Sequence, residues 1–117
     1  MATILYVEDH PPAQLLMKAI INEMTTHALY AANSGAEART ITLAQHPDLY
    51  IIDLDLPDTD GISLAAELRK LHLAPVLLVS AYAESVKESD MSANILAYLA
   101  KPLDPDDVEI AVRRALA

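Results

Sequence analysis

The chain has 117 residues, of which 53% are hydrophobic and 21% charged, and these values predict one folded domain over residues 1–117. Eight Lys and Arg residues against seventeen Asp and Glu give a net charge of −9, so we expect no nucleic-acid and no membrane partner. The absence of cysteine excludes disulfides and thiolate metal sites. No apolar run reaches the roughly 18 residues of a membrane span, and the first residues lack a basic leader, so we expect a cytoplasmic protein.

The first half of the chain alternates predicted strands with predicted helices. The continuous apolar run Ile4–Val7 is typical of a strand that is covered on both faces. Apolar residues recur at helical spacing over Pro11–Met24, behind prolines that suit a helix N-terminus. Thr26–Ala31 is a weaker strand because its first residues are polar, and Gly35–Gln45 is a poorly periodic helix. Leu49–Leu54 is a second continuous apolar strand.

The second half continues this alternation. Leucines three and four positions apart predict a helix that begins near Gly61. Val76–Val79 is a third continuous apolar strand, 84–93 is a polar helix, and 97–99 is a short strand. Asp104 is predicted to cap the last helix, which has acidic residues in its first turn and arginines near its end. Such alternation indicates right-handed βαβ units, and therefore an α/β fold with a parallel sheet between two helical layers.

Polar side chains follow the predicted strands at the sheet edge where ligands bind in such folds. They are Glu8 and Asp9, then Asp53 and Asp55, then Ser80, and finally Lys101, which Pro102 follows. Clustered carboxylates repel one another, and a hard divalent cation such as Mg²⁺, with Mn²⁺ as a substitute, would offset that repulsion. A carboxylate beside the cation can then act as a nucleophile toward phosphorus, and a lysine can attract the incoming phosphoryl group. These residue types predict a site that captures a phosphoryl group.

Four segments together resemble the response-regulator receiver domain, the CheY-like family of two-component signalling. They are ILYVED, IIDLDLPDTDG, PVLLVSA and AYLAKP, which occur in the order and spacing of that family and span essentially the whole chain. The resemblance implies a doubly wound (βα)5 fold of the flavodoxin type, with five parallel strands in the order 2-1-3-4-5. It also implies a phosphorelay switch rather than an enzyme.

The resemblance implies that Asp53 is the phosphoacceptor. Asp9 would ligate Mg²⁺ directly, whereas Glu8 would act mainly through metal-bound water. Asp53 and the backbone carbonyl of Asp55 would complete the metal contacts, and the Asp55 side chain would face the mouth of the site.

Further residues receive roles from the same resemblance. Ser80 and Lys101 would contact the phosphoryl group, and Tyr98 would turn inward when Ser80 moves toward it. Tyr82 would border the path of attacking water and slow the loss of the phosphoryl group. Pro102 would follow a cis peptide bond, which directs the lysine before it.

The implied phosphoryl donor is a histidine kinase or a histidine phosphotransfer protein. A second copy of the chain or a downstream protein would dock on the last two helices and the strand between them. The new charge on the phosphorylated domain would shift that surface between two states.

Three alternatives remain at this level. Asp53 and Asp55 also match the DxD of haloacid-dehalogenase-type phosphatases, although Pro57 stands where that family has Thr or Val. The chain is also short for that family, and Glu8 with Asp9 would have no role there. The domain could instead be a pseudo-receiver that never carries phosphate. Finally, Asp53 and Lys101 could form a structural ion pair with no chemistry.

Overall fold

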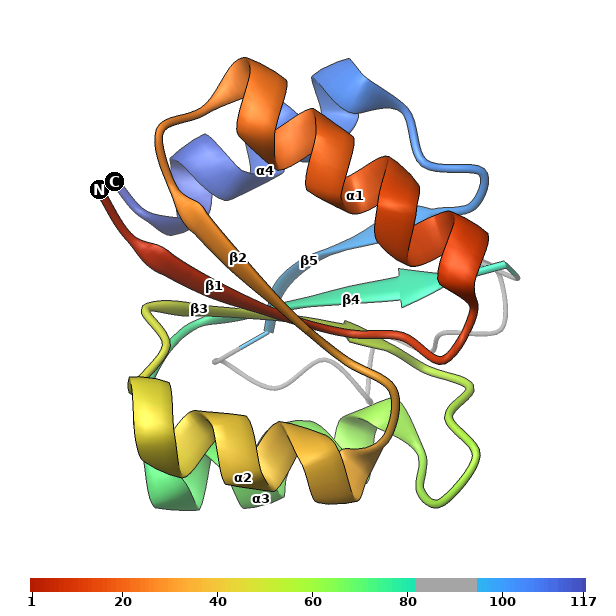
Figure 1. Ribbon diagram of the computed structural model, residues 1–117, viewed down its shortest axis with the longest axis vertical. Helices are drawn as coiled ribbons and strands as arrows, with labels where there is room; N and C mark the ends of the chain where they lie inside the picture. The colour runs from red at the N-terminus through yellow and green to blue at the C-terminus, as the bar shows by residue number, and fades with distance from the viewer. Residues whose placement is uncertain (82–94) are drawn as a thin grey trace.

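The computed structural model describes residues 1–81 and 95–117, and one parallel sheet lies at its centre (Figure 1). Its strands are β1 (Thr3–Val7), β2 (Ala28–Ala32), β3 (Leu49–Asp53), β4 (Val76–Ser80) and β5 (Ile95–Ala100). The strand order is β2-β1-β3-β4-β5, and every neighbouring pair is parallel. The predicted fold class and strand order are therefore confirmed.

Two helical layers enclose the sheet. The helices are α1 (Pro11–Met24), α2 (Gly35–Gln45), α3 (Gly61–Leu71) and α4 (Pro105–Ala115). Figure 1 shows α1 and α4 on one face of the sheet and α2 with α3 on the other. The helix predicted over 84–93 lies outside the described residues. Among the described helices, none is both long enough and apolar enough to cross a membrane.

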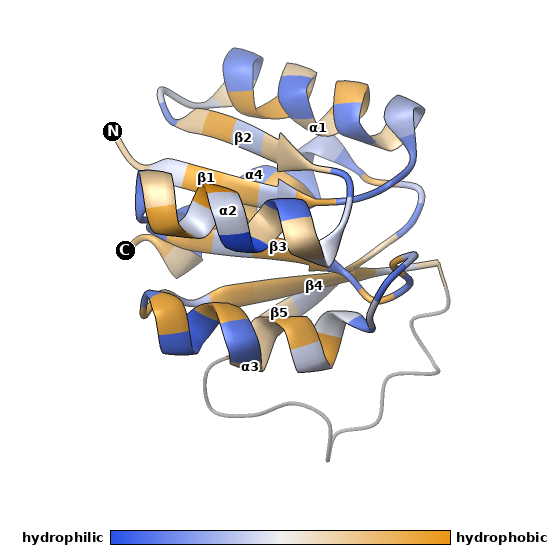
Figure 2. Ribbon diagram, turned by 60° about the horizontal axis from the view of Figure 1, so that its bottom comes forward, coloured by the Kyte–Doolittle hydropathy of each residue, from blue (hydrophilic) through white to orange (hydrophobic). Residues whose placement is uncertain are grey.

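The alternation of side chains along each strand divides the core in two. On β1, Ile4 and Tyr6 pack beneath α1 and α4, whereas Leu5 and Val7 pack toward α2 and α3. The central strands β1, β3 and β4 are mainly hydrophobic in Figure 2, because both of their faces are covered. This explains why strand prediction from continuous apolar runs succeeded for β1, β3 and β4.

The weaker predictions differ from the structure at their ends. The second strand is Ala28–Ala32, so the polar residues Thr26 and His27 lie before it. β5 extends over six residues, Ile95–Ala100, where only three were predicted. As predicted, Asp104 caps α4, and its side chain accepts hydrogen bonds from the backbone N–H groups of Asp106 and Asp107.

Candidate functional site

The site residues lie where four strands end at one edge of the sheet. Glu8 directly follows β1, Asp53 is the last residue of β3, and Ser80 is the last of β4. Lys101 directly follows β5, and its backbone N–H donates to the carbonyl of Ser80 at 2.9 Å. Parallel pairing places these positions in adjacent strands at the same height, with Asp53 opposite Val79 and Ser80 opposite Ala100. The strands thus bring residues from the whole chain to one rim.

Three carboxylates meet at this rim. Glu8, Asp9 and Asp53 each offer an oxygen, and these oxygens lie within 4.8 Å of one another. Consecutive residues of a strand point to opposite faces, so Glu8 and Asp9 can approach one point only because β1 ends at Val7. Glu8 and Asp53 are buried, whereas Asp9 is exposed at the mouth.

Lys101 supplies the positive charge of the cluster. Its Nζ lies 2.8 Å from Glu8 Oε1 and 3.4 Å from Asp53 Oδ2. Burial disfavours the charged ammonium, but its hydrogen bonds and its attraction to both carboxylates outweigh this and raise the pKa of Lys101. This lysine therefore stays protonated and offsets part of the negative charge.

Glu8 carries the most perturbed carboxyl group of the site. Burial and its contact with Asp53 raise its pKa to about 7, although the hydrogen bond from Lys101 acts in the opposite direction. One lysine therefore does not neutralise the three carboxylates. Glu8 Oε2 is buried and has no hydrogen-bond partner among residues 1–81 and 95–117. An all-oxygen donor set with surplus negative charge and an unpaired buried oxygen fits a hard divalent cation.

The other predicted site residues have more varied surroundings. Asp55 is exposed, and its backbone N–H donates to Asp53 Oδ1 at 3.4 Å, while its side chain is not part of the carboxylate cluster. Ser80 is buried at the rim, and the peptide bond between Lys101 and Pro102 is cis. Tyr82 lies outside the described residues.

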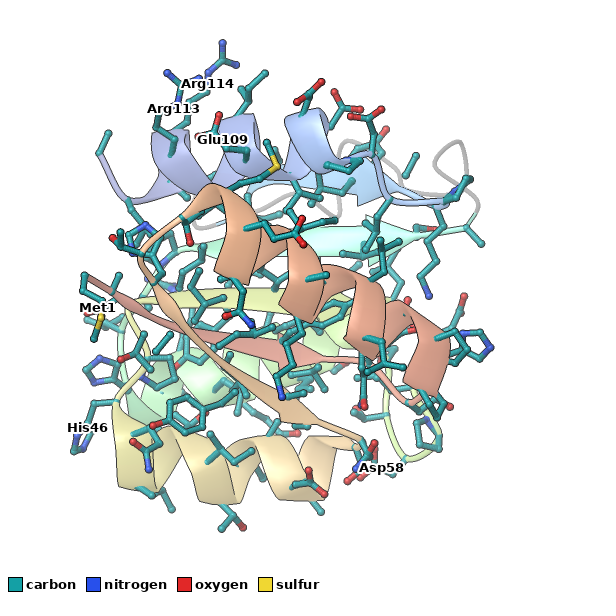
Figure 3. All side chains as sticks on the ribbon, turned by 45° about the horizontal axis from the view of Figure 1, so that its top comes forward. Met1, His46, Asp58, Glu109, Arg113 and Arg114 are labelled. Carbon is teal, nitrogen blue, oxygen red and sulfur yellow. The ribbon has the colours of Figure 1, made fainter. Side chains whose placement is uncertain are left out.

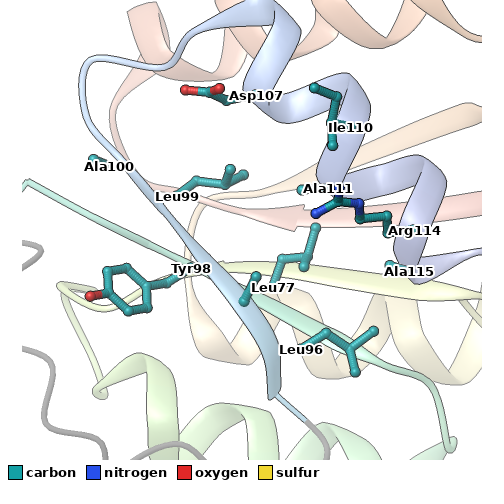
Figure 4. Close-up of a pocket in the computed structure, with 11 residues that line it drawn as sticks. Leu77, Leu96, Tyr98, Leu99, Ala100, Asp107, Ile110, Ala111, Arg114 and Ala115 are labelled. Carbon is teal, nitrogen blue, oxygen red and sulfur yellow. The ribbon is translucent and has the colours of Figure 1, made fainter.

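Tyr98 is 38% exposed on β5. Its ring points away from α4, while Leu77, Leu99, Ile110 and Ala111 surround a groove on the other side of the strand (Figure 4). The exposed Leu96 also borders this groove, which lies between β5 and α4. The strand that was predicted to carry the signal therefore presents apolar surface.

The loop after β3 is held by its own acidic residues, Asp58 and Asp60. Asp60 caps α3 by accepting from Ser63 N at 2.8 Å. Asp58 accepts from the backbone N–H groups of Gly35 and Ala36 at the start of α2, at 2.9 and 3.1 Å. Figure 3 shows Asp58 at that end of α2. The contact between Asp58 and α2 spans 23 positions and could not be predicted from local sequence.

One buried polar group near the site was missed by sequence reasoning. Tyr6 is fully buried on β1, two residues before Glu8, and its hydroxyl has no hydrogen-bond partner among the described residues. The signal in the sequence was an aromatic hydroxyl within the continuous apolar run of β1.

Comparison with known proteins agrees with this geometry. The family model described as the response regulator receiver domain matches residues 4–113. Sporulation initiation phosphotransferase F of Bacillus subtilis is 29% identical over 97% of this chain and 92% of its own length. The transcriptional regulatory protein PdtaR of Mycobacterium tuberculosis is also 29% identical over 95% of this chain, which spans only 57% of that protein.

Solved structures extend the likeness to three dimensions. The response regulator protein TrrA from Thermotoga maritima, solved in complex with Mg(2+)-BeF, superimposes with a TM-score of 0.87. It is 28% identical and is covered over 100% of its length by 99% of this chain. A CheY-like receiver domain from Methylobacillus flagellatus has a TM-score of 0.88 at 25% identity, with 98% of each chain covered. The chain belongs to the response regulator receiver domain family, the signalling switches of two-component systems.

Proposed function

We propose that this chain is a phosphorylation-activated switch in which Asp53 accepts a phosphoryl group in a Mg²⁺-dependent reaction. The observation that carries the proposal is the meeting of the Glu8, Asp9 and Asp53 carboxylates with the Lys101 ammonium at one rim. The TrrA structure, solved with Mg(2+)-BeF, supports the same type of site. The phosphoryl donor would be a phosphohistidine on a histidine kinase or a phosphotransfer protein.

Different residues of the site would have different roles in the phosphoryl transfer. A carboxylate oxygen of Asp53 attacks phosphorus and forms an O–P bond, while the N–P bond of the donor breaks and its electron pair stays on the imidazole nitrogen. Asp9 would ligate Mg²⁺ directly, Glu8 would hold it mainly through water, and the backbone carbonyl of Asp55 would add a ligand. When bound, the cation would supply positive charge to offset that of the phosphoryl oxygens.

Positive charge and hydrogen-bond donors then retain the phosphoryl group. Lys101 already lies 3.4 Å from Asp53 Oδ2, so its ammonium is within reach of an oxygen bound to phosphorus. Ser80 would donate a hydrogen bond from its hydroxyl to the same group, and Tyr98 would turn inward as Ser80 moves.

Tyr82 would shield the site from water. A longer aspartyl-phosphate lifetime in the wild type than in Tyr82→Ala is the expected result, and an equal lifetime would reject this role.

A binding partner would recognise the phosphorylated protein on the surface of β5 and the helices beside it. The exposed Leu96 and Tyr98 give this strand an apolar surface to which a second copy or a downstream protein could bind. Addition of beryllofluoride with Mg²⁺ should shift the NMR resonances of Tyr98. Unchanged Tyr98 resonances would contradict a signal through β5.

The central test is the intact mass of the protein after incubation with acetyl phosphate and Mg²⁺. The wild type should gain one phosphoryl group, and Asp53→Asn should gain none. Asp58→Asn serves as the matched control because Asp58 lies in the loop after β3, accepts hydrogen bonds from the start of α2 and is outside the carboxylate cluster. Equal labelling of Asp53→Asn and wild type would refute the assignment. Repeated turnover of a phosphate ester would instead indicate a phosphatase.

A further inference from the structure

Tyr6 combines complete burial with an unpaired hydroxyl. Its side chain packs in the core beneath α1 and α4 among aliphatic residues that include Met17, Ile51 and Val79. Its Oη has no hydrogen-bond partner among residues 1–81 and 95–117. A buried hydroxyl without a partner costs free energy, and phenylalanine would fill the same space without that cost. We therefore looked for a role of this hydroxyl that phenylalanine could not fulfil.

The position of Tyr6 in the sheet points to such a role. Tyr6 pairs with Ile51 across β1 and β3, and the next residue on the same face of each strand is Glu8 and Asp53, respectively. The alternation continues to Glu8, because its backbone N–H still bonds the carbonyl of Ala32 on β2 at 2.9 Å. The tyrosine thus lies one residue pair below two members of the carboxylate cluster.

The charges around the hydroxyl keep it a donor. Burial, and then the negative charges of Glu8 and Asp53, raise the pKa of Tyr6 far above its ordinary value. Both effects favour the neutral form of the side chain, which keeps its O–H proton. It remains available to donate a hydrogen bond to an acceptor nearby.

The acceptor is present on Glu8. Its Oε1 accepts from Lys101 Nζ at 2.8 Å, whereas its Oε2 is buried and unpaired among the described residues. Within the described part of the chain, a donor and an acceptor without partners thus lie two positions apart on the same side of the sheet. Hydrogen bonds of this kind to a carboxylate that serves a metal ion set its orientation.

We propose that Tyr6 is a positioning residue whose hydroxyl donates a hydrogen bond toward Glu8 Oε2 through one water and orients this carboxylate for the cation. The inference rests on the proposed function, since it requires that the carboxylate cluster binds Mg²⁺. It goes beyond that function by assigning a role to a core residue that touches neither the cation nor the phosphoryl group.

The test measures Mg²⁺ affinity by isothermal titration calorimetry for wild type, Tyr6→Phe and Tyr50→Phe. Tyr50 is the matched control because it is equally buried on the opposite face of the sheet, where its hydroxyl donates to the carbonyls of Leu68 and His72. We expect Tyr6→Phe to weaken Mg²⁺ binding about 10-fold, as loss of a partner of a metal-binding side chain does. Tyr50→Phe should bind Mg²⁺ like the wild type.

Thermal unfolding without Mg²⁺ separates a positioning role from a structural one. Tyr6→Phe should unfold at the wild-type temperature or above it, because it removes a buried hydroxyl that has no partner in the described ranges. Tyr50→Phe should unfold at a lower temperature, because it removes the hydroxyl that donates to the carbonyls of Leu68 and His72. The two variants thus have opposite profiles, one losing metal affinity and the other losing stability.

A measurement on the wild type makes the test independent of any variant. The ring ¹³Cζ resonance of Tyr6 should shift when Mg²⁺ is added, and that of Tyr50 should not. Wild-type Mg²⁺ affinity in Tyr6→Phe, or an unchanged Tyr6 resonance, would overturn the inference while leaving the proposed function intact. Absence of Mg²⁺ binding by the wild type would instead refute the proposed function.

Discussion

The ammonium of Lys101 lies 2.8 Å from the buried carboxylate of Glu8, although 93 positions separate the two residues in the sequence. Lys101 also contacts Asp53 at 3.4 Å, so one cation holds together two acidic residues that come from different strands. This contact joins the beginning and the end of the domain at the candidate site. It makes the stability of the domain depend on the charge balance of the site.

Removal of this ammonium should destabilise the protein. Lys101→Met keeps most of the side-chain length but leaves Glu8 and Asp53 without their cation, which should lower the free energy of unfolding by about 3 kcal/mol at pH 8. The loss should be smaller at pH 5, where protonation of Glu8 relieves the repulsion. Urea unfolding without Mg²⁺ at both pH values measures it. Lys70→Met, at an exposed position of α3, is the control and should leave stability unchanged. An equal loss at both pH values would contradict the charge explanation.

The raised pKa of Glu8 predicts how stability changes with pH. The pKa is about 7 in the folded protein and 4.5 in the unfolded chain, so between these values the folded state binds more protons. The free energy of unfolding of the metal-free protein should therefore fall as pH rises from about 4.5 to about 7. Urea unfolding in EDTA measures this slope. Glu8→Gln should flatten it, and a slope that Glu8→Gln leaves unchanged would point to another group.

The stabilisation of the folded protein by Mg²⁺ should increase with pH, whereas the stability of the metal-free protein should decrease. A cation needs the ionised carboxylate, so its affinity should rise with pH through the pKa of Glu8. The increase in unfolding temperature on adding Mg²⁺ should thus be larger at pH 8 than at pH 6. Differential scanning calorimetry with and without Mg²⁺ checks this result. A stabilisation that does not depend on pH would argue against a role for Glu8 in binding.

Gly61 should be the less replaceable of the two glycines. A Cβ at Gly61 would lie 2.5 Å from the backbone oxygen of Asp53 and 2.9 Å from the Cα of Leu54, so the end of β3 would have to move. Gly61→Ala should therefore reduce both the unfolding temperature and the labelling of Asp53 by acetyl phosphate.

Gly35→Ala is the matched control for this substitution. Its Cβ would meet the side chains of Thr59 at 3.0 Å and Asp58 at 3.3 Å, which can move more easily than a backbone. We expect a smaller loss of stability and normal labelling. Thermal melts and intact mass measured on both variants give the comparison. Normal labelling of Gly61→Ala would show that the end of β3 tolerates the displacement.

Asp58 should contribute to stability without contributing to the chemistry. Its hydrogen bonds from the N–H groups of Gly35 and Ala36 lower its pKa, so its ionised form stabilises the folded protein. That stabilisation is present above the ordinary pKa of 3.8 and is lost as pH falls through the lower, folded value. Asp58→Ala should therefore lower the unfolding temperature at pH 7 and have less effect in acid. Labelling of Asp53 should stay normal, and a loss of labelling would assign this loop a role in the transfer.

Much of the fold was predictable because its signals are local. β1, β3 and β4 are covered on both faces, so each appears in the sequence as an unbroken apolar run. Asp104 caps a helix whose N–H groups lie two and three residues further along the chain. β2 and β5 were harder to delimit because they are the edge strands and carry exposed residues such as Tyr30 and Leu96.

The sequence could predict which residues form the site, but not how their atoms are arranged. Parallel strands present their carboxyl ends at one edge, so Glu8, Asp53 and Lys101 could be expected at the same rim. Which oxygens meet was not predictable, because it depends on where β1 stops and on the register of β3, β4 and β5. The hydrogen bonds of Asp58 to α2 could not be predicted either, nor could the lack of a partner for the Tyr6 hydroxyl among the residues that the structure describes.

The sequence by itself determined the alternation of strands and helices, the residue types at the strand ends and the resemblance to receiver domains. Each of these follows from short-range patterns of hydropathy, turn residues and motifs. Only the tertiary structure decided that Lys101 contacts Glu8 as well as Asp53, and that Glu8 and Tyr6 are fully buried. Burial and charge pairing arise between segments distant in sequence, and they follow from strand order and register rather than from neighbouring residues.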